Sequence, residues 1–215
     1  MADCGLRIRV AALAIVALGA GARAGGGEVI DRVLAVAAGQ LIMLSDVAAA
    51  RDLGLVAVDR ASDPIGAVLS ALVDRQLILV EVDRYAPPDP SDEAVDRQVQ
   101  GVRTRVASPQ ALEAALARSG IDERHLREML RQNLRIEAYE AQRFTVPPPT
   151  DDEIGRYYRE HPQPFTRAGQ LVPFDTARPD IVRALTDERR KALIADWVAG
   201  LRKRADVVIL YRPGR

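Results

Sequence analysis

The sequence predicts a mostly α protein in which a small β-sheet joins a hairpin near the N-terminus to a strand near the C-terminus. Three observations support this fold class. Residues 65–85 are apolar over most of the circumference of a helix, and several later segments are apolar on one side only. β-Branched residues gather at 28–44 and again at 206–211, and pairing between these two regions would tie down both termini.

Residues 1–24 have the pattern of a secretory signal peptide. Arg7 and Arg9 precede an apolar stretch over 10–20, and the sequence Ala-Arg-Ala at 22–24 fits a cleavage site. The apolar stretch is about half of the ~20 residues that a spanning helix needs, so cleavage and a periplasmic location are expected. A retained membrane anchor is the alternative. The chain's one cysteine, Cys4, lies in this segment, so the exported form would have no disulfide and no thiol chemistry.

The first elements after this segment are expected to be a hairpin and a short helix. Residues 28–44 are rich in Val, Ile and Leu on both sides of Ala-Gly-Gln at 38–40, which predicts two strands and a turn. The Ser-Asp pair at 45–46 is expected to cap a helix that runs to about residue 53, and Gly54 is expected to end it.

Residues 65–85 predict the helix around which the other elements pack. Asp63 and Pro64 are typical of a helix start, and the two prolines at 87–88 cannot continue a helix. Its polar strip is narrow and consists of Asp74, Glu81 and Arg84. A helix with so little polar surface is normally covered from several sides.

Three one-sided helices are expected between residues 91 and 144. Ser91 caps the first, whose core-facing stripe is Val95, Val99, Val102 and Val106. Ser108-Pro109 begins the second, which closes at Ser119-Gly120 and turns inward Leu112, Ala115 and Leu116. Asp122 caps the third, whose broader stripe is Leu126, Met129, Leu130, Leu134, Ala141 and Phe144.

The C-terminal part begins with a stiff proline-rich linker at 146–149. Thr150 and Glu153 have the spacing of a capping box and predict a helix to about residue 160. Residues 161–178 are rich in Pro and Gly and are expected to be irregular. Two helical segments, 179–185 and a second from about 187 to 205, should then lead to a strand at 206–211 that pairs with the N-terminal hairpin.

Charge and motif content exclude several classes of function. Three of the 30 basic and one of the 30 acidic residues lie in segment 1–24, so 27 basic and 29 acidic residues remain after it. This near balance of charge does not suggest a nucleic-acid binder. The sequence has no P-loop for a nucleotide and no nucleophile elbow. His125 and His161 lie far apart without ligand-spaced companions, which favours surface histidines over a metal site. The acidic residues at 151–153 are explained by helix capping. We therefore expect no catalytic residue, no metal and no cofactor.

The order of these elements resembles the chaperone module of the SurA/parvulin-type family of periplasmic folding factors. The resemblance covers nearly all of the chain after residue 24. It is carried by the helix start GQLIMLSDV, the central helix LVDRQLILVEVDRY, the helical region SPQALEAALARSGIDERHLREMLRQNLRIEAYEAQRF, the capping turn TDDEIGRYYREHPQPF and the closing segment DIVRALTDERRKALIADWVAGLRKRADVVIL. The resemblance implies a SurA N-terminal-like helical core that binds unfolded polypeptides, often those destined for the outer membrane, without ATP.

The sequence departs from this family's pattern at residues 161–178. Members with prolyl isomerase activity carry a parvulin domain at this place, but these 18 residues are far fewer than the ~50 that a folded domain needs. We therefore expect no isomerase activity. The expected organisation is a signal peptide at 1–24, one core domain built from 25–160 and 179–211, and a linker at 161–178.

Apolar side chains outside the helix stripes are the candidates for contacts with a client. They are Tyr139, Tyr157, Tyr158, Phe165, Leu171 and Phe174. Apolar grooves with free backbone groups could hold an extended polypeptide with little side-chain specificity. The alternative for each residue is packing against the helical core at the shortened junction.

The sequence thus supports two hypotheses for function. The first is an ATP-independent holdase whose partners are unfolded or extended polypeptides, outer-membrane proteins among them, with no nucleic-acid or nucleotide partner. The second is an assembly or scaffold protein that uses the same fold to hold one specific partner.

Overall fold

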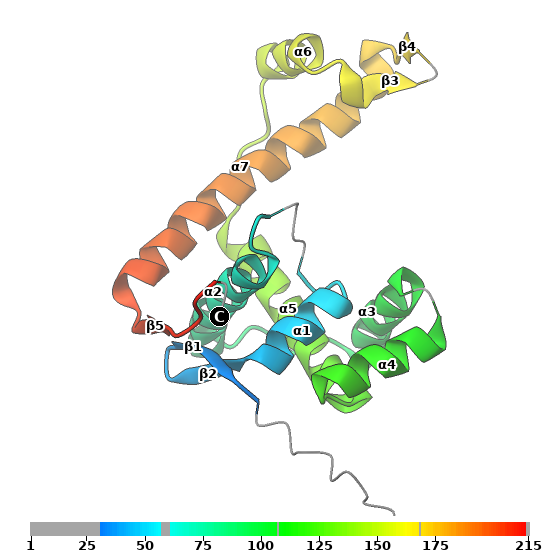
Figure 1. Ribbon diagram of the computed structural model, residues 1–215. Helices are drawn as coiled ribbons and strands as arrows, with labels where there is room; N and C mark the ends of the chain where they lie inside the picture. The colour runs from blue at the N-terminus through cyan, green and yellow to red at the C-terminus, as the bar shows by residue number, and fades with distance from the viewer. Residues whose placement is uncertain (1–30, 57–60, 107, 168, 214–215) are drawn as a thin grey trace, which may run out of the picture. The chain divides into compact units, whose positions relative to one another are not determined.

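The computed structural model describes residues 31–213 except 57–60, 107 and 168, and the predicted signal peptide at 1–24 lies outside the described residues. Residues Asp31–Arg215 form one compact unit. This unit is mostly helical with a small antiparallel sheet, which confirms the predicted fold class (Figure 1). No helix within the described ranges is both long and apolar enough to cross a membrane.

The main sheet has the strand order β2-β1-β5 and is antiparallel throughout. Its strands are β1 (Val33–Ala37), β2 (Gln40–Met43) and β5 (Val207–Ile209). The turn between β1 and β2 has positive φ at both central residues, 48° at Ala38 and 79° at Gly39, as the twist of a tight hairpin favours. The predicted hairpin and its pairing with the C-terminal strand are both confirmed.

Helix α1 (Leu44–Asp52) begins two residues earlier than a cap at Ser45 predicts, because the chain enters it directly from β2. Residues 45 and 46 therefore lie in the first turn and do not cap it from outside. The Asp46 carboxylate accepts a hydrogen bond from the backbone N–H of Met43 at 2.8 Å, and the backbone N–H of Ser45 donates to Asp31 at 3.2 Å. Gly54, with φ of 61°, follows the helix end as expected.

Helix α2 (Pro64–Tyr85) is the central helix of the unit. It contacts β1, β2, α1 and two helices further along the chain, α5 (Glu123–Arg143) and α7 (Phe174–Arg204) (Figure 1). Eight of its residues are buried: Val68, Leu69, Leu72, Val73, Leu77, Ile78, Leu79 and Val82. The Asp63 carboxylate accepts from the N–H of Gly66 at 3.0 Å and from the Tyr211 hydroxyl at 2.9 Å, so the start of α2 is tied to the end of the chain.

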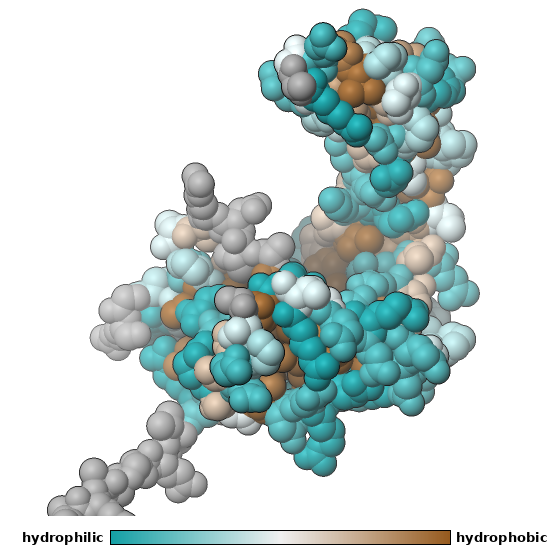
Figure 2. All heavy atoms as spheres, turned by 90° about the vertical axis from the view of Figure 1, so that its right-hand side faces the viewer, coloured by the Kyte–Doolittle hydropathy of each residue, from teal (hydrophilic) through white to brown (hydrophobic). Residues whose placement is uncertain are grey.

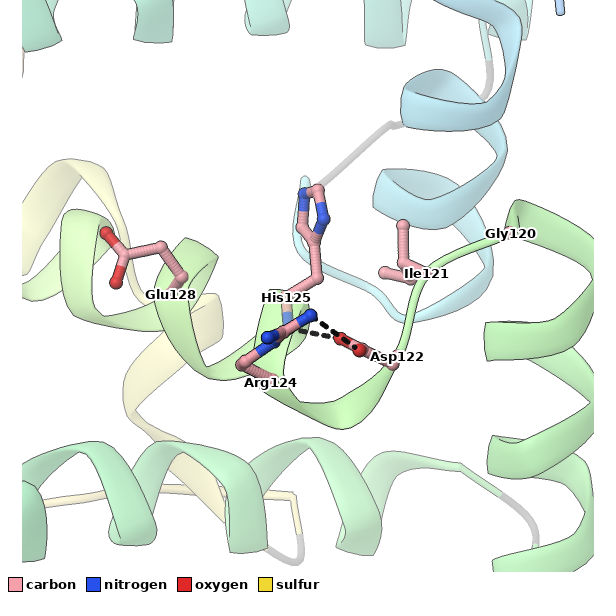
Figure 3. A pocket seen from close by; sticks show the side chains of 6 residues that line it. All are labelled: Gly120, Ile121, Asp122, Arg124, His125 and Glu128. Carbon is pink, nitrogen blue, oxygen red and sulfur yellow. Dashed lines mark hydrogen bonds and ion pairs between the residues drawn. The ribbon is translucent and has the colours of Figure 1, made fainter.

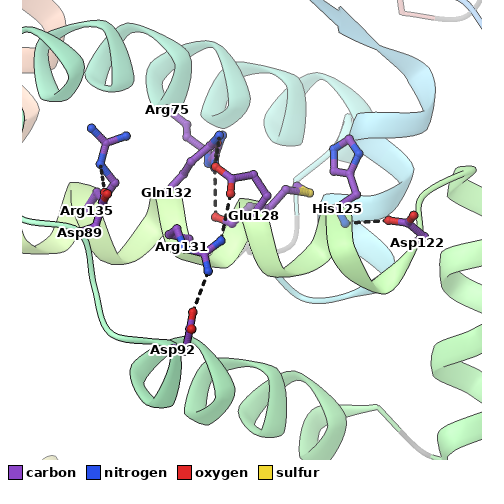
Figure 4. Close-up of polar contacts among 10 residues, drawn as sticks. Arg75, Asp89, Asp92, Asp122, His125, Glu128, Arg131, Gln132 and Arg135 are labelled. Atoms are coloured by element: carbon purple, nitrogen blue, oxygen red, sulfur yellow. Dashed lines mark hydrogen bonds and ion pairs between the residues drawn. The ribbon is translucent and has the colours of Figure 1, made fainter.

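Helices α3 (Asp92–Arg105), α4 (Pro109–Ser119) and α5 (Glu123–Arg143) begin at the predicted caps. With α1 they enclose a second apolar core of Ala49, Leu53, Val99, Val102, Leu112, Ala115, Leu126 and Leu130. Arg75 of α2 donates to Asn133 of α5 at 2.8 Å. Arg75 also donates to Gln132 of α5 at 2.9 Å, and Arg131 of α5 pairs with Asp92 of α3 at 3.0 Å (Figure 4).

The stripe predicted for α5 is wrong at one position. Ala141 is exposed, while Tyr139 is buried at 5% exposure. The reason is tertiary: in the last turns of α5 the neighbour is Trp197 of α7, whose ring centre is 5.8 Å from that of Tyr139. The buried face of α5 therefore shifts toward α7 near its end.

Helix α6 (Asp151–Glu160) carries the predicted capping box at Thr150 and Glu153. Segment 161–178, which was expected to be irregular, contains a 3₁₀ turn (Gln163–Phe165) and the start of α7. Between them lies a short hairpin whose strands, β3 (Thr166–Arg167) and β4 (Gln170–Leu171), have two residues each.

Helix α7 (Phe174–Arg204) is continuous where two helical segments were expected. Pro179 lies within its second turn, and Thr186 does not cap a new helix. The Thr186 hydroxyl instead donates back to the carbonyl of Val182 at 2.7 Å, an arrangement that a helix interior accepts. Burial of Ala177 and Ile181 on either side of the proline favours the unbroken helix.

Candidate peptide-binding surface

The first half of α7 packs against α6 in a small apolar core of its own, separate from the two cores around α2 and α3. We call it the α6–α7 cluster. Its buried members are Ile154, Phe165, Ala177 and Ile181, and its half-buried rim includes Tyr157, Tyr158, Val172 and Phe174. Four of the six predicted contact residues thus lie in one cluster.

Leu171 is the fifth predicted residue and lies on the surface beside this cluster. It is 47% exposed on β4, next to Val172, whose backbone N–H donates to the carbonyl of Phe165 at 2.8 Å. Hydrophobic atoms are visible on this part of the molecule, where α6, β3 and β4 lie (Figure 2). The short hairpin therefore presents an apolar side chain at the rim of an aromatic core.

The aromatic rings of the cluster are held in tilted and edge-on contacts. Tyr158 lies 5.4 Å from Phe174 and 6.0 Å from Phe165, centre to centre, and its hydroxyl donates to the Val172 carbonyl at 2.5 Å. The hydroxyl of Tyr157 donates to Glu188 at 3.1 Å, and burial and this hydrogen bond raise its pKa. Both tyrosines thus offer apolar ring surface with their polar tips already satisfied.

Polar contacts hold α6 in place on α7. The Glu153 carboxylate accepts from the backbone N–H of Thr150 at 2.7 Å and pairs with Arg189 of α7. These contacts, the Thr150 N–H first, lower the pKa of Glu153 from 4.5 to about 2. Arg178 of α7 pairs with Asp151 at 2.5 Å. The cluster is therefore fixed by ion pairs at its edges as well as by its apolar centre.

Tyr139, the sixth predicted residue, does not belong to this surface. Its ring lies between Tyr85 and Trp197, with centres 5.7 and 5.8 Å away, in the main core. The Arg143 guanidinium lies 5.8 Å from the ring centre. Burial of Tyr139 and of Phe165, at 5% and 7% exposure, fits the packing alternative for these two residues.

A groove along the second half of α7 was not found by sequence reasoning. It has a volume of about 500 Å³ and is lined by Asp74, Glu140, Lys191, Ile194, Ala195, Val198, Ala199 and Arg202. Burial and the charge of Glu137 raise the pKa of Glu140. Ile194 and Val198 are four residues apart on one helix face, and this spacing alone does not distinguish a core from the floor of a groove. The signal that could have found it is the pair of cationic residues, Lys191 and Arg202, on the same helix face as these apolar residues.

A depression at the start of α5 is lined by Gly120, Ile121, Asp122, Arg124, His125 and Glu128 (Figure 3). Asp122 accepts from the N–H of His125 at 2.7 Å and pairs with Arg124 at 3.4 Å, so its carboxylate already serves as the helix cap. His125 is exposed, and residues 31–213, apart from the undescribed positions, contain no group of three side chains that could hold a metal ion. The depression offers no chemistry beyond capping.

Comparisons with known proteins give a likeness to solved structures. No family model and no curated protein matches the sequence. This chain is similar to a solved structure from a study of Campylobacter jejuni. That study describes the virulence factor PEB4 and the periplasmic protein Cj1289 as structurally related SurA-like chaperones. The two chains are 10% identical, the match covers 84% of this chain and 99% of the other, and the TM-score is 0.47.

Proposed function

We propose that the protein is an ATP-independent holdase for unfolded or extended polypeptides, exported to the periplasm, with outer-membrane proteins among its clients. The observation that carries this proposal is the α6–α7 cluster, which has half-buried aromatic rings and the exposed Leu171 on the adjoining strand β4. The arrangement of sequence elements that resembles the SurA/parvulin-type family points in the same direction.

The rim suits weak and unspecific contacts. Tyr157, Tyr158 and Phe174 expose only part of their rings, so each can contact an apolar side chain of a client without becoming fully buried. Their rotamers are already restricted by packing, which lowers the entropy lost on binding. Affinity would come from several such contacts, and clients with different sequences would be held reversibly.

The proposal includes the absence of isomerase activity. Residues 161–178 form a 3₁₀ turn, the β3–β4 hairpin and the first residues of α7, and 18 residues are too few for a further folded domain. A proline-peptide assay tests this part separately. Cis–trans exchange faster than the uncatalysed rate would contradict it.

The test of the holdase role is suppression of aggregation of several unrelated unfolded proteins at near-stoichiometric amounts and without nucleotide. Leu171→Asp should weaken suppression, because it places a charge on the apolar rim at an exposed position that does not support the fold. The matched control is Leu193→Asp on α7, since Leu193 is 45% exposed but lies outside the cluster.

Two results would overturn the proposal. If the wild-type protein protects none of the clients, it is not a holdase, and binding to a single folded partner would support the scaffold alternative. If Leu171→Asp and Leu193→Asp protect clients as well as the wild type, the α6–α7 rim is not the binding surface.

A further inference from the structure

The groove along the second half of α7 contains an acidic side chain without a partner. Glu140 of α5 is half-buried and lines this groove, and its carboxylate has no hydrogen bond or ion pair with any described residue. The described side-chain atoms that are fully enclosed without a partner belong to Arg135 and Tyr139, so the Glu140 oxygens are still open to the groove. Burial and the charge of Glu137 raise the pKa of Glu140, as expected for a carboxylate without a counter-charge.

The arginines near Glu140 are held by other groups. Arg202 lines the same groove but pairs with Asp74 and donates to a carbonyl and a hydroxyl of α2 at 2.8 and 2.7 Å. Arg143 lies one turn after Glu140, but its guanidinium lies over three aromatic rings, 5.5–5.8 Å from their centres. Lys191 is exposed at the groove and forms no ion pair within the described part of the chain. The Glu140 carboxylate is therefore open to a cation from outside the chain.

The floor of the groove is apolar and has the length of a short extended peptide. Ile194 and Val198 are half-buried, two exposed alanines lie beside them, and Ile194 belongs to none of the three apolar cores. Lys191 and Arg202 line the groove eleven positions apart on α7, about 16 Å along the helix axis. An extended chain of about five residues spans this length. Such a floor accommodates the aliphatic stem of a basic side chain, whose charged head stays at a polar edge.

We propose that this groove binds an extended segment of a client polypeptide through an arginine or lysine side chain. The charged head of that side chain pairs with Glu140, and its aliphatic stem lies on Ile194 and Val198. Hydrogen bonds between charged groups are shorter and stronger than those between neutral groups, and the half-buried position of the carboxylate limits competition from water.

The groove is a site separate from the α6–α7 cluster, since the two share no residue. The inference rests on the proposed function in one respect, that the ligand is an unfolded polypeptide. It adds a preference to that function. The rim of the cluster offers apolar contacts without charge selection, whereas the groove selects segments in which a basic residue is flanked by apolar ones.

Fluorescence anisotropy of short labelled peptides tests the proposal on protein purified after expression of the full chain. The probes are the pentapeptide Ala-Leu-Arg-Leu-Ala with blocked ends and its analogues with Gln or Glu in place of Arg. The Arg peptide should bind about tenfold more tightly than the Gln peptide, and the Glu peptide should bind most weakly. Glu140→Gln should bind the Arg and Gln peptides equally, and Glu140→Lys should reverse the order in favour of the Glu peptide. Glu137→Gln is the matched control, an exposed carboxylate one turn earlier on α5 that does not line the groove, and should keep the preference.

Glu140→Gln should remain folded by circular dichroism, because its carboxylate has no contact to lose, so its peptide binding can be compared directly with that of the wild type. Equal binding of the Arg and Gln peptides by the wild type, or a preference that persists in Glu140→Gln, would overturn the proposal. A preference that appears only in Lys191→Gln would overturn it too, because the chain's own lysine would then occupy the site. None of these results alters suppression of aggregation or the effect of Leu171→Asp. A failure of this inference is therefore distinguishable from a failure of the holdase proposal.

Discussion

Replacing Tyr139 tests whether this ring is a core residue, as its position indicates, or a client-binding residue. The ring is 5% exposed and contacts Tyr85 and Trp197. Truncation to alanine should destabilise the protein by about 3–5 kcal/mol, the range for large buried side chains, of which each lost aromatic pair accounts for about 0.5–1.5 kcal/mol. Its hydroxyl has no hydrogen-bond partner among the described residues, and burial raises its pKa. Tyr139→Phe should therefore leave the stability unchanged or increase it by up to about 1–2 kcal/mol.

The assay is urea unfolding followed by far-ultraviolet circular dichroism and by tryptophan fluorescence. Trp197 is the chain's only tryptophan and lies 5.8 Å from Tyr139 and 5.2 Å from Phe144, centre to centre, so its emission reports on this cluster directly. Client binding by Tyr139→Phe should equal that of the wild type. A loss of more than about 1 kcal/mol in Tyr139→Phe would show that the hydroxyl has a partner. A loss below about 1 kcal/mol in Tyr139→Ala would show that the ring is not part of the core.

Three further predictions concern the helices around this core. Pro179→Ala should raise stability by up to about 3 kcal/mol in urea unfolding, because it restores an N–H inside α7; a loss would contradict this reasoning. Asn133→Ala should destabilise the protein by about 1–3 kcal/mol, because it leaves the guanidinium of Arg75 short of an acceptor. Arg75→Met should destabilise it less, since this change removes the charge itself. The reverse order of the two unfolding midpoints would refute this reasoning. The pKa of Glu153 is lowered to about 2, so its stabilising contribution is present above pH 4.5 and is lost as the pH falls toward 2. A pH series of unfolding curves should show this loss, Glu153→Gln should lack it, and equal slopes in both proteins would contradict the assignment.

The helix boundaries could be predicted because local chemistry determines them. Ser91, Ser108 and Asp122 each accept a hydrogen bond from the N–H three residues later, and Gly120 adopts φ of 65° at the end of α4. The pairing of β5 with β1 could also be predicted, because the sequence offers few other strands.

The face of a helix that is buried depends on neighbours that a local pattern does not contain. The α5 stripe was extended to Ala141 by spacing alone, whereas Trp197, distant in sequence, draws Tyr139 into the core. The local sequence around Pro179 and Thr186 predicts a helix boundary at each of them. In the structure the packing of α7 against α6 and α2 outweighs this local tendency, and the helix continues through both residues.

The same effect narrows the candidate binding surface. Tyr139 and Tyr158 are chemically identical, and sequence analysis treated them alike, yet one lies in the main core and the other at the rim of the α6–α7 cluster. The two tyrosines differ because they pack against different halves of α7. The half near β5 contributes Trp197 and Leu201 to the main core, while the half near α6 contributes Ala177 and Ile181 to the small cluster. Because the small cluster has few buried residues, its aromatic rings cannot all be covered, and partial exposure at its rim is a direct consequence of its size. A surface suited to weak apolar contacts therefore arises where α6, segment 161–178 and the start of α7 form a core too small to enclose its own rings.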